Sequence, residues 1–446
     1  MKNLLLCVAL FVAGVPAAAT EILTVREQAR VIDEILAERL DTLLPTLMRR
    51  NGIDMWIVVS REYNEDPVLR TMLPSTWLNA RRRTILVFHD DPGKQAFEKL
   101  AVARYDVGDR IEAAWDMQRF PQQWDALADI VATRDPKKIA INLSSDFAHA
   151  DGLVHTDYTE LMKALPEGLR SRVVPAEALA VGWLETRSAR EMQIYPQLAR
   201  ITHSIIAEAF SEQVITPGIT TSDDVAWWLR QRVGDLGLAT WFHPTVSIQR
   251  ADGEDFDHLK SFTDHPRGEI IREGDLLHVD FGITYLRLNT DVQEHAYVLR
   301  PGETQVPPGI ARAMATANRL QDILTGEFAI GRTGNQILAA ALAEARKQGI
   351  KATIYTHPLG SHGHAAGPTI GMWDQQDGVP GSGDFPMHAD TVYSIELNAA
   401  SAIPEWKKEI RIMLEQDGGF DGKTFRYLDG RQRSIHLIPR QRSGDT

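Results

Sequence analysis

The 446-residue sequence is poor in three features: thiols, long apolar segments and surplus positive charge. Its single cysteine is Cys7, so neither a disulfide nor a zinc–thiolate site is expected in the rest of the chain. After the first residues, no run approaches the ~20 apolar residues that a membrane-spanning helix needs. The 60 acidic and 48 basic residues give a formal net charge of −12, which disfavours nucleic acid as the main partner.

Residues 1–19 have the pattern of a secretory signal peptide. Lys2 provides the positive start, residues 4–15 are apolar, and Ala17-Ala18-Ala19 offers a cleavage site made of small residues. The apolar run is too short for a membrane anchor. We therefore expect a secreted or periplasmic mature chain that has no cysteine and no membrane contact.

Hydrophobic periodicity divides the remaining chain into two domains. Apolar residues recur at helical spacing from Val31 to Leu47. Three short apolar strands follow, at 55–59, 84–88 and 139–143. This alternation predicts an α/β domain over residues 20–183. A capping-box pattern at residues 188–191 opens a long helix, so we place the second domain at 184–446.

The second domain repeats itself loosely. Helical stretches follow Gly218 and Gly331, and each glycine is followed, 62 or 65 residues later, by an acid in an apolar strand. A second acid comes 11 residues later in the first half and 13 residues later in the second half. The four acids are Asp280, Asp291, Glu396 and Glu409. Two helix-and-hairpin units with paired carboxylates indicate two pseudo-equivalent halves that face one site.

These acids lie in strands, where a carboxylate is costly unless it is paired or bound to a metal. His278 and Asp280 share the strand face opposite Val279, and Glu409 lies opposite Ile410. Between the two acid pairs, three histidines occur within eight glycine-containing residues: His357, His362 and His364. Four carboxylates together with one imidazole carry too much negative charge for a single Zn²⁺, but they suit two divalent ions with shared carboxylates.

The order Asp, Asp, His, Glu, Glu, with the second aspartate eleven residues after the first, resembles the pita-bread metallopeptidases. This family includes methionine aminopeptidase, Xaa-Pro aminopeptidase and prolidase. Further similar features are Pro217-Gly218 at a helix start, Asp280-Phe281-Gly282, and the stretch from Glu409 to Gly418-Gly419. The resemblance implies an amino-terminal α/β domain of the creatinase type, followed by a pseudo-symmetric α+β pita-bread catalytic domain, and a homodimer.

The resemblance also implies roles for individual residues. Asp280 would bind one ion, Asp291 and Glu409 would bridge both, and His362 and Glu396 would complete the shell of the other. Glu396 would also be the general base. The ions would be Mn, Co, Zn or Fe, between which a carboxylate-rich site does not discriminate.

Three departures from the family pattern concern residues around this shell. The family has a second histidine seven residues after the metal-binding histidine, where Thr369 follows His362; His357 or His364 could take this catalytic role. Lys407 stands where the proline-specific branch has arginine. The histidine expected about 17 residues before Asp280 has two candidates, at 15 and 22 residues before it: His265 and His258.

These observations predict a dinuclear-metal exopeptidase that hydrolyses the amino-terminal bond of short peptides, with Xaa-Pro peptides as one candidate substrate class. Two alternatives stay open. One is a creatinase-like amidohydrolase that acts on non-peptide substrates. The other is a catalytically silent binding protein on the same fold.

Overall fold

The computed structural model describes residues 22–440, except 92, 94–95 and 253–267. The predicted signal peptide at 1–19 and the two candidate histidines His258 and His265 lie outside the described residues. Among the helices described, none combines the length and the apolar character needed to cross a bilayer.

The amino-terminal part is built on one six-stranded sheet with strand order β4-β3-β2-β1-β5-β6. The strands are β1 (Met55–Arg61), β2 (Arg83–Asp91), β3 (Ala96–Ala101), β4 (Glu112–Ala113), β5 (Ile139–Ile141) and β6 (Val173–Pro175). β1 and β2 are buried on both faces, since Trp56 and Ile57 point into different cores. This double burial explains why these strands are almost continuously apolar.

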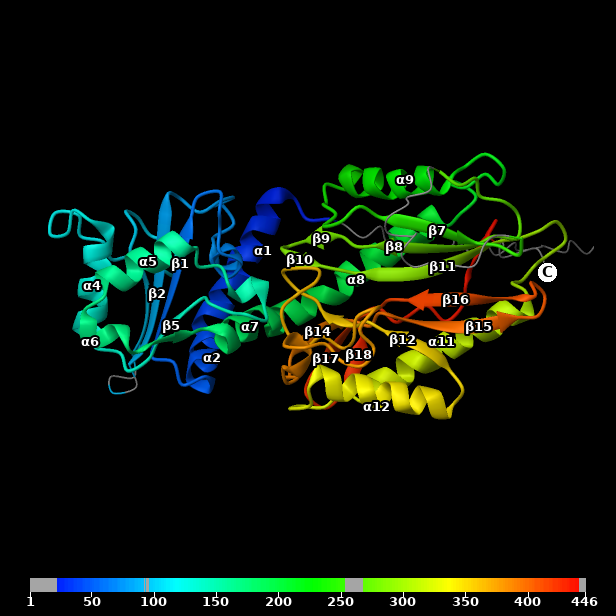
Figure 1. Ribbon diagram of the computed structural model, residues 1–446. Helices are drawn as coiled ribbons and strands as arrows, with labels where there is room; N and C mark the ends of the chain where they lie inside the picture. Colours follow the sequence, from blue (N-terminus) through cyan, green and yellow to red (C-terminus); the bar gives the residue numbers. More distant parts are fainter. Residues whose placement is uncertain (1–21, 92, 94–95, 253–267, 441–446) are drawn as a thin grey trace, which may run out of the picture.

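Helices cover both faces of this sheet (Figure 1). One face carries α4 (Gln123–Arg134), α5 (His155–Ala164) and α6 (Glu167–Arg170). The face toward the second domain carries α1 (Val25–Glu38), a π-helical segment (Arg39–Leu43), α2 (Leu44–Arg50), α3 (Pro67–Met72), a short 3₁₀ turn (Ala148–Ala150) and α7 (Glu177–Glu185). α2 ends at Asn51-Gly52, and Gly52 has a φ of +61°, which an L residue adopts rarely.

The second domain contains the predicted repeat. The first half runs α8 (Ala189–Ala209), α9 (Ser222–Asp235), β7 (Thr245–Gln249), β8 (Leu276–Phe281) and β11 (Val292–Val298). The second half runs α11 (Pro308–Gly326), α12 (Gly334–Lys347), β12 (Lys351–Ile354), β15 (Leu397–Ile403) and β16 (Lys408–Leu414). In each half three antiparallel strands lie in the same sequential order. α9 and α12 flank the strands on opposite sides in Figure 1.

Helix caps fix where these units begin. Ser188 and Glu191 form the predicted capping box of α8. Thr221 with Asp224 caps α9, and Thr333 with Gln336 caps α12 in the same way. Each cap satisfies backbone N–H groups that the first helical turn leaves unpaired.

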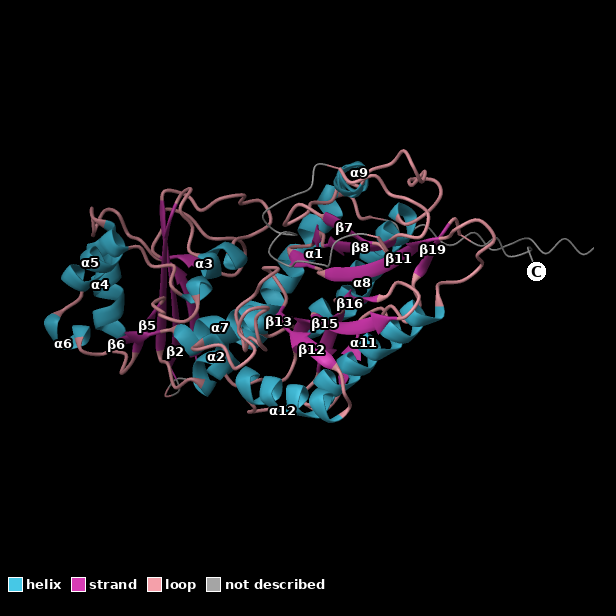
Figure 2. Cartoon of the chain, turned by 45° about the vertical axis from the view of Figure 1, so that its right-hand side comes forward, coloured by secondary structure: helices cyan, strands magenta, loops and turns pink. Residues whose placement is uncertain are grey.

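Short strands complete the domain: β9 (Thr284–Tyr285), β10 (Leu288–Asn289), β13 (His357–Pro358), β14 (Thr391–Ser394), β17 (Asp417–Phe420), β18 (Phe425–Tyr427) and β19 (His436–Ile438), with a 3₁₀ turn at Ser382–Asp384. β19 extends the first half's sheet, and β13, β14, β17 and β18 form a sheet of their own. Figure 2 shows β11 and β16 side by side between the halves. The predicted fold class, an α/β domain followed by a pseudo-symmetric α+β domain, is confirmed.

The two halves are joined by backbone hydrogen bonds between β11 and the end of β16. The N–H of Gln293 donates to the carbonyl of Glu415 at 2.9 Å, and the N–H of Glu415 donates back to Gln293 at 3.3 Å. The N–H of Asp291 donates to the carboxylate of Asp417 at 3.2 Å. Acidic residues of both halves are therefore brought together at this junction.

Candidate metal centre

Six side chains from both halves converge beside this junction. Their ligand atoms form overlapping groups, in each of which the atoms lie within 4.8 Å of one another. The six residues are Asp280 at the end of β8, Asp291 before β11, His357 in β13, His364 after it, Glu396 before β15 and Glu415 after β16. Each half contributes acids from a pair of neighbouring strands, as the repeat predicts.

The carboxylates of this cluster lie close together and are largely buried. Glu415 is 1% exposed and Asp291 is 3% exposed. Burial and the charge of Glu415 raise the pKa values of Asp280, Asp291 and Glu396. One buried oxygen of Asp280 and one of Asp291 have no hydrogen-bond partner. Crowded acids with unpartnered oxygens are the environment that divalent cations relieve, so the residues fit a metal centre.

His357 is the buried histidine of the cluster. Its Nε2 lies 3.4 Å from Glu415 Oε1 and 3.5 Å from Asp291 Oδ2, while Nδ1 lies 3.0 Å from the carbonyl of Pro358. Burial lowers the pKa of His357, but the hydrogen bond and the charge of Glu415 outweigh burial and raise it to about 9. A bound divalent cation would displace this proton and use Nε2 as a ligand.

Gln293 holds the two glutamates from behind. Its amide N–H₂ donates to Glu396 and, at 2.8 Å, to Glu415. Its carbonyl oxygen lies 2.8 Å from Nε2 of His278, whose Nδ1 lies 3.3 Å from the Ser247 hydroxyl. Gln293 is not among the predicted site residues, although it follows Asp291 by two residues and therefore shares its strand face.

Two members of the predicted ligand set lie apart from the others. Glu409 lies at the far end of β16, where its carboxylate is 2.5 Å from Lys351 Nζ and 41% exposed. His362 packs instead against His149, with 4.4 Å between ring centroids, and belongs to none of the ligand groups found among the described residues. Glu415 and His357 occupy the places that the sequence analysis gave to these two residues.

When His357 rather than His362 is the histidine beside the acids, one departure from the family pattern disappears. His364 follows His357 by seven residues, so the spacing that Thr369 did not satisfy is met. The rings of His357 and His364 lie 4.7 Å apart, and His364 shares a ligand group with Asp291. Likewise, when Glu415 is the last glutamate, the position two residues before it, where the proline-specific branch has arginine, is Met413 and not Lys407.

The fold and this cluster define a two-domain protein with a carboxylate-rich site suited to divalent metals. Residues 194–417, half of the chain, match metallopeptidase family M24, and the chain belongs to this family. Its catalytic domain therefore has the pita-bread fold that the resemblance implied, and it belongs to a family of metal-dependent peptidases.

Solved structures with the same fold cover nearly the whole chain. An X-Pro aminopeptidase from Thermotoga maritima MSB8 is 17% identical with a TM-score of 0.61, covering 88% of this chain and 100% of that one. An Xaa-Pro dipeptidase from Bacillus anthracis is 14% identical with a TM-score of 0.58, covering 93% and 100%. A prolidase from Pyrococcus horikoshii OT3 is 15% identical with a TM-score of 0.55, covering 92% and 99%. A search of curated proteins finds no significant match.

Proposed function

We propose that the protein is a dinuclear-metal exopeptidase that removes the amino-terminal residue of short peptides, Xaa-Pro peptides among them. The observation that carries the proposal is the convergence of four acids and His357 in one buried cluster. Five ligands with shared carboxylates suit two divalent ions rather than one. The fold shared with Xaa-Pro peptidases supports the choice of substrate class.

The side chains of the cluster have distinct roles in this proposal. Asp280, Asp291, His357, Glu396 and Glu415 would hold the ions. Bound divalent ions would polarise the scissile carbonyl and lower the pKa of an attacking water. Glu396, whose carboxylate accepts a hydrogen bond from the amide of Gln293, would take the proton of that water as general base.

His364 is placed to stabilise developing negative charge. Loss of hydration and the nearby charge of His357 lower the pKa of His364 to about 4, so its imidazole is neutral at pH 7. A neutral imidazole carries one N–H that can donate to an oxyanion. Its position next to His357 and Asp291 puts that donor beside the cluster.

The test combines metal analysis with a peptide panel. The purified chain is assayed on Xaa-Pro and Xaa-Ala dipeptides and tripeptides with added Mn²⁺, Co²⁺ or Zn²⁺, and Asp291→Asn is the inactive comparison. We expect cleavage that depends on metal and is lost in the variant. Metal binding without cleavage of any peptide would contradict the proposal and favour a creatinase-like or a silent protein.

A further inference from the structure

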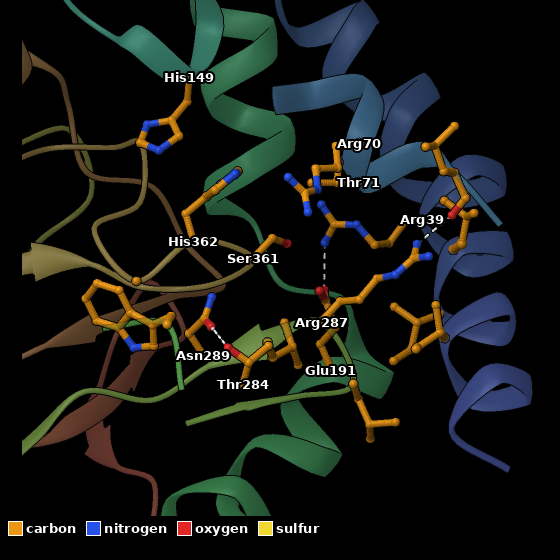
Figure 3. A pocket seen from close by; sticks show the side chains of 18 of the residues that line it. Arg39, Arg70, Thr71, His149, Glu191, Thr284, Arg287, Asn289, Ser361 and His362 are labelled. Carbon is orange, nitrogen blue, oxygen red and sulfur yellow. Dashed lines mark hydrogen bonds and ion pairs between the residues drawn. The ribbon is translucent and has the colours of Figure 1, made fainter. Parts of the chain in front are cut away.

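A cavity of about 650 Å³ lies between the two domains, beside the candidate metal centre. α1 and α3 form its wall on the amino-terminal side, and the β9–β10 hairpin and residues 361–364 form its wall on the catalytic side. Figure 3 shows Thr284 of the hairpin and His362 of this loop at the cavity. His364 also lines the cavity and is a member of the metal-centre cluster. Its ring therefore lies where the cavity meets the metal centre.

The His364 ring is oriented by packing rather than by hydrogen bonds. Among the described residues, no group forms a hydrogen bond with either of its ring nitrogens. Two aromatic neighbours contact the ring instead: Trp241 at 5.2 Å between centroids and His357 at 4.7 Å. The interplanar angles are 78° and 85°, so both contacts are edge to face. The torsion that turns a histidine ring has broad minima, so these contacts set the orientation of the ring.

Trp241 is itself held in place by the strands around it. It lies in the segment between α9 and β7, and its Nε1–H donates to the carbonyl of Thr290 at 2.9 Å. Two residues earlier, the carbonyl of Ala239 accepts from the N–H of Thr284 in β9 at 2.6 Å. Thr290 is buried and directly precedes Asp291. The indole is therefore bonded to the backbone next to an acid of the metal centre.

Two glycines leave room for the indole. A Cβ atom at Gly363 would lie 2.4 Å from carbon atoms of the six-membered ring of Trp241, and a Cβ atom at Gly282 would lie 2.5 Å from its Nε1. Neither glycine has a positive φ, so the requirement is for space and not for a backbone conformation. Gly363 directly precedes His364. The indole therefore packs against both the backbone and the ring of the histidine segment.

We propose that Trp241 is a positioning residue, whose indole holds the His364 imidazole in the orientation that the reaction at the metal centre needs. The inference rests on the proposed peptidase function and adds a residue to that site. A donor aimed at an oxyanion works only in a narrow geometry, and a misplacement of ~1 Å can cost about a hundredfold in rate. The Nε1–H of Trp241 is already bound to Thr290, so the indole acts through His364.

The first test measures kcat and KM of the purified, metal-loaded full chain on a short peptide that it cleaves. Trp241→Leu removes the aromatic contact, and Gly363→Ala displaces the indole from the other side. We expect each change to lower kcat about tenfold or more, with KM changed less than about threefold. Trp241→Phe should keep most of the activity, because it retains an aromatic ring. The control Trp227→Leu replaces an exposed tryptophan on α9 and should leave both constants unchanged.

A double-mutant cycle separates positioning from a general structural effect. In a His364→Ala background, Trp241→Leu should lower kcat no further, because the residue that Trp241 orients is gone. A second loss of about tenfold in that background overturns the proposal. So does a rise in KM without a loss of kcat in the otherwise unchanged chain, since that result would make Trp241 a substrate contact.

Crystal structures of the metal-loaded variants give a readout that needs no cleavage. We expect one orientation of the His364 ring in the unchanged chain and in Trp241→Phe, and more than one in Trp241→Leu. A single, unchanged ring orientation in Trp241→Leu overturns the proposal. The expected difference in a chain that cleaves no peptide would instead sink only the peptidase proposal.

Discussion

At the scale of single residues, the site depends on which histidine faces the carboxylates. His357 contacts Asp291 and Glu415, whereas His362 contacts His149 in the cavity. We expect His357→Ala to lower metal-dependent peptidase activity by about a hundredfold or more, since it removes a ligand. His362→Ala should keep the metal content of the wild type. Elemental analysis and peptide cleavage of both variants check this, and retained metal affinity in His357→Ala would contradict the assignment.

Gln293 acts as a positioning residue through its hydrogen bonds to Glu396 and Glu415. Gln293→Leu should weaken metal binding by about 10–100-fold and lower kcat with little change in KM, because groups behind the ligands orient them. Gln249→Leu is the matched control: Gln249 is a buried glutamine on β7 whose side chain, among the described residues, bonds to the backbone of Arg411. Equal losses of metal affinity in the two variants would show a purely structural role.

The sequence identified Asp280, Asp291 and Glu396 because alternating strands expose each acid on one face. The same alternation cannot locate a residue along its strand: Glu409 and Glu415 share a face of β16 and its extension but lie six residues, about 20 Å, apart. For a related reason, the sequence does not show which of the three clustered histidines binds with the acids. Which of them faces the acids depends on the backbone path through β13, and local spacing does not determine that path.

At the scale of elements, His295 connects the sheets of the two halves. From β11, its Nδ1 lies 3.0 Å from the carbonyl of Leu277 in β8, and its Nε2 accepts from the N–H of Met413 in β16 at 3.0 Å. A neutral imidazole satisfies both contacts, and burial together with the charge of His278 lowers the pKa of His295 to about 3.

This lowered pKa gives a pH dependence with a definite sign. The unfolded chain protonates His295 below pH ~6.5 while the folded chain does not, so the unfolded state binds more protons and stability falls as pH decreases from about 6.5 toward 3. The slope from this residue is about 1.4 kcal/mol per pH unit. Thermal unfolding between pH 4.5 and 7 should show a shallower dependence in His295→Gln. An unchanged slope would contradict this.

Element boundaries with local signals were predictable, and those without them were not. The start of α8 at Ser188 and the end of α2 at Asn51-Gly52 are predictable because the residue types at these positions favour helix ends. The π-helical segment after Glu38 interrupts an apolar repeat that reads as one continuous helix. The turn at Leu286-Arg287 contains no Gly or Asn, so the sequence does not predict its positive φ values. Tertiary contacts rather than local preference hold this conformation.

At the scale of the whole molecule, the acidic surplus is concentrated in part at the metal centre. Burial raises the pKa values of Asp280, Asp291, Glu396 and Asp417, so without metal their ionisation opposes folding. An acid whose pKa is raised on folding stabilises the folded state at pH values below its unfolded pKa of about 4. This stabilisation is lost as the pH rises through the folded-state pKa. Chelation should therefore lower Tm more at pH 8 than at pH 5, as calorimetry can check. Equal losses would contradict this.

The cavity between the domains is a whole-molecule feature that the sequence did not predict. Arg70 and Arg287 are more than two hundred residues apart in the chain, and both line the cavity because the amino-terminal domain packs against the β9–β10 hairpin. No local sequence pattern identifies either arginine as a cavity residue, so the cavity is visible only in the folded molecule.

The central claim is that Glu415, and not Glu409, completes a two-ion centre with Asp280, Asp291, His357 and Glu396. Equilibrium dialysis against Mn²⁺, followed by elemental analysis, measures it directly. The account predicts about two ions per chain for the wild type and for Glu409→Gln, and fewer for Glu415→Gln. Wild-type levels of bound Mn²⁺ in Glu415→Gln, together with a loss in Glu409→Gln, would contradict it.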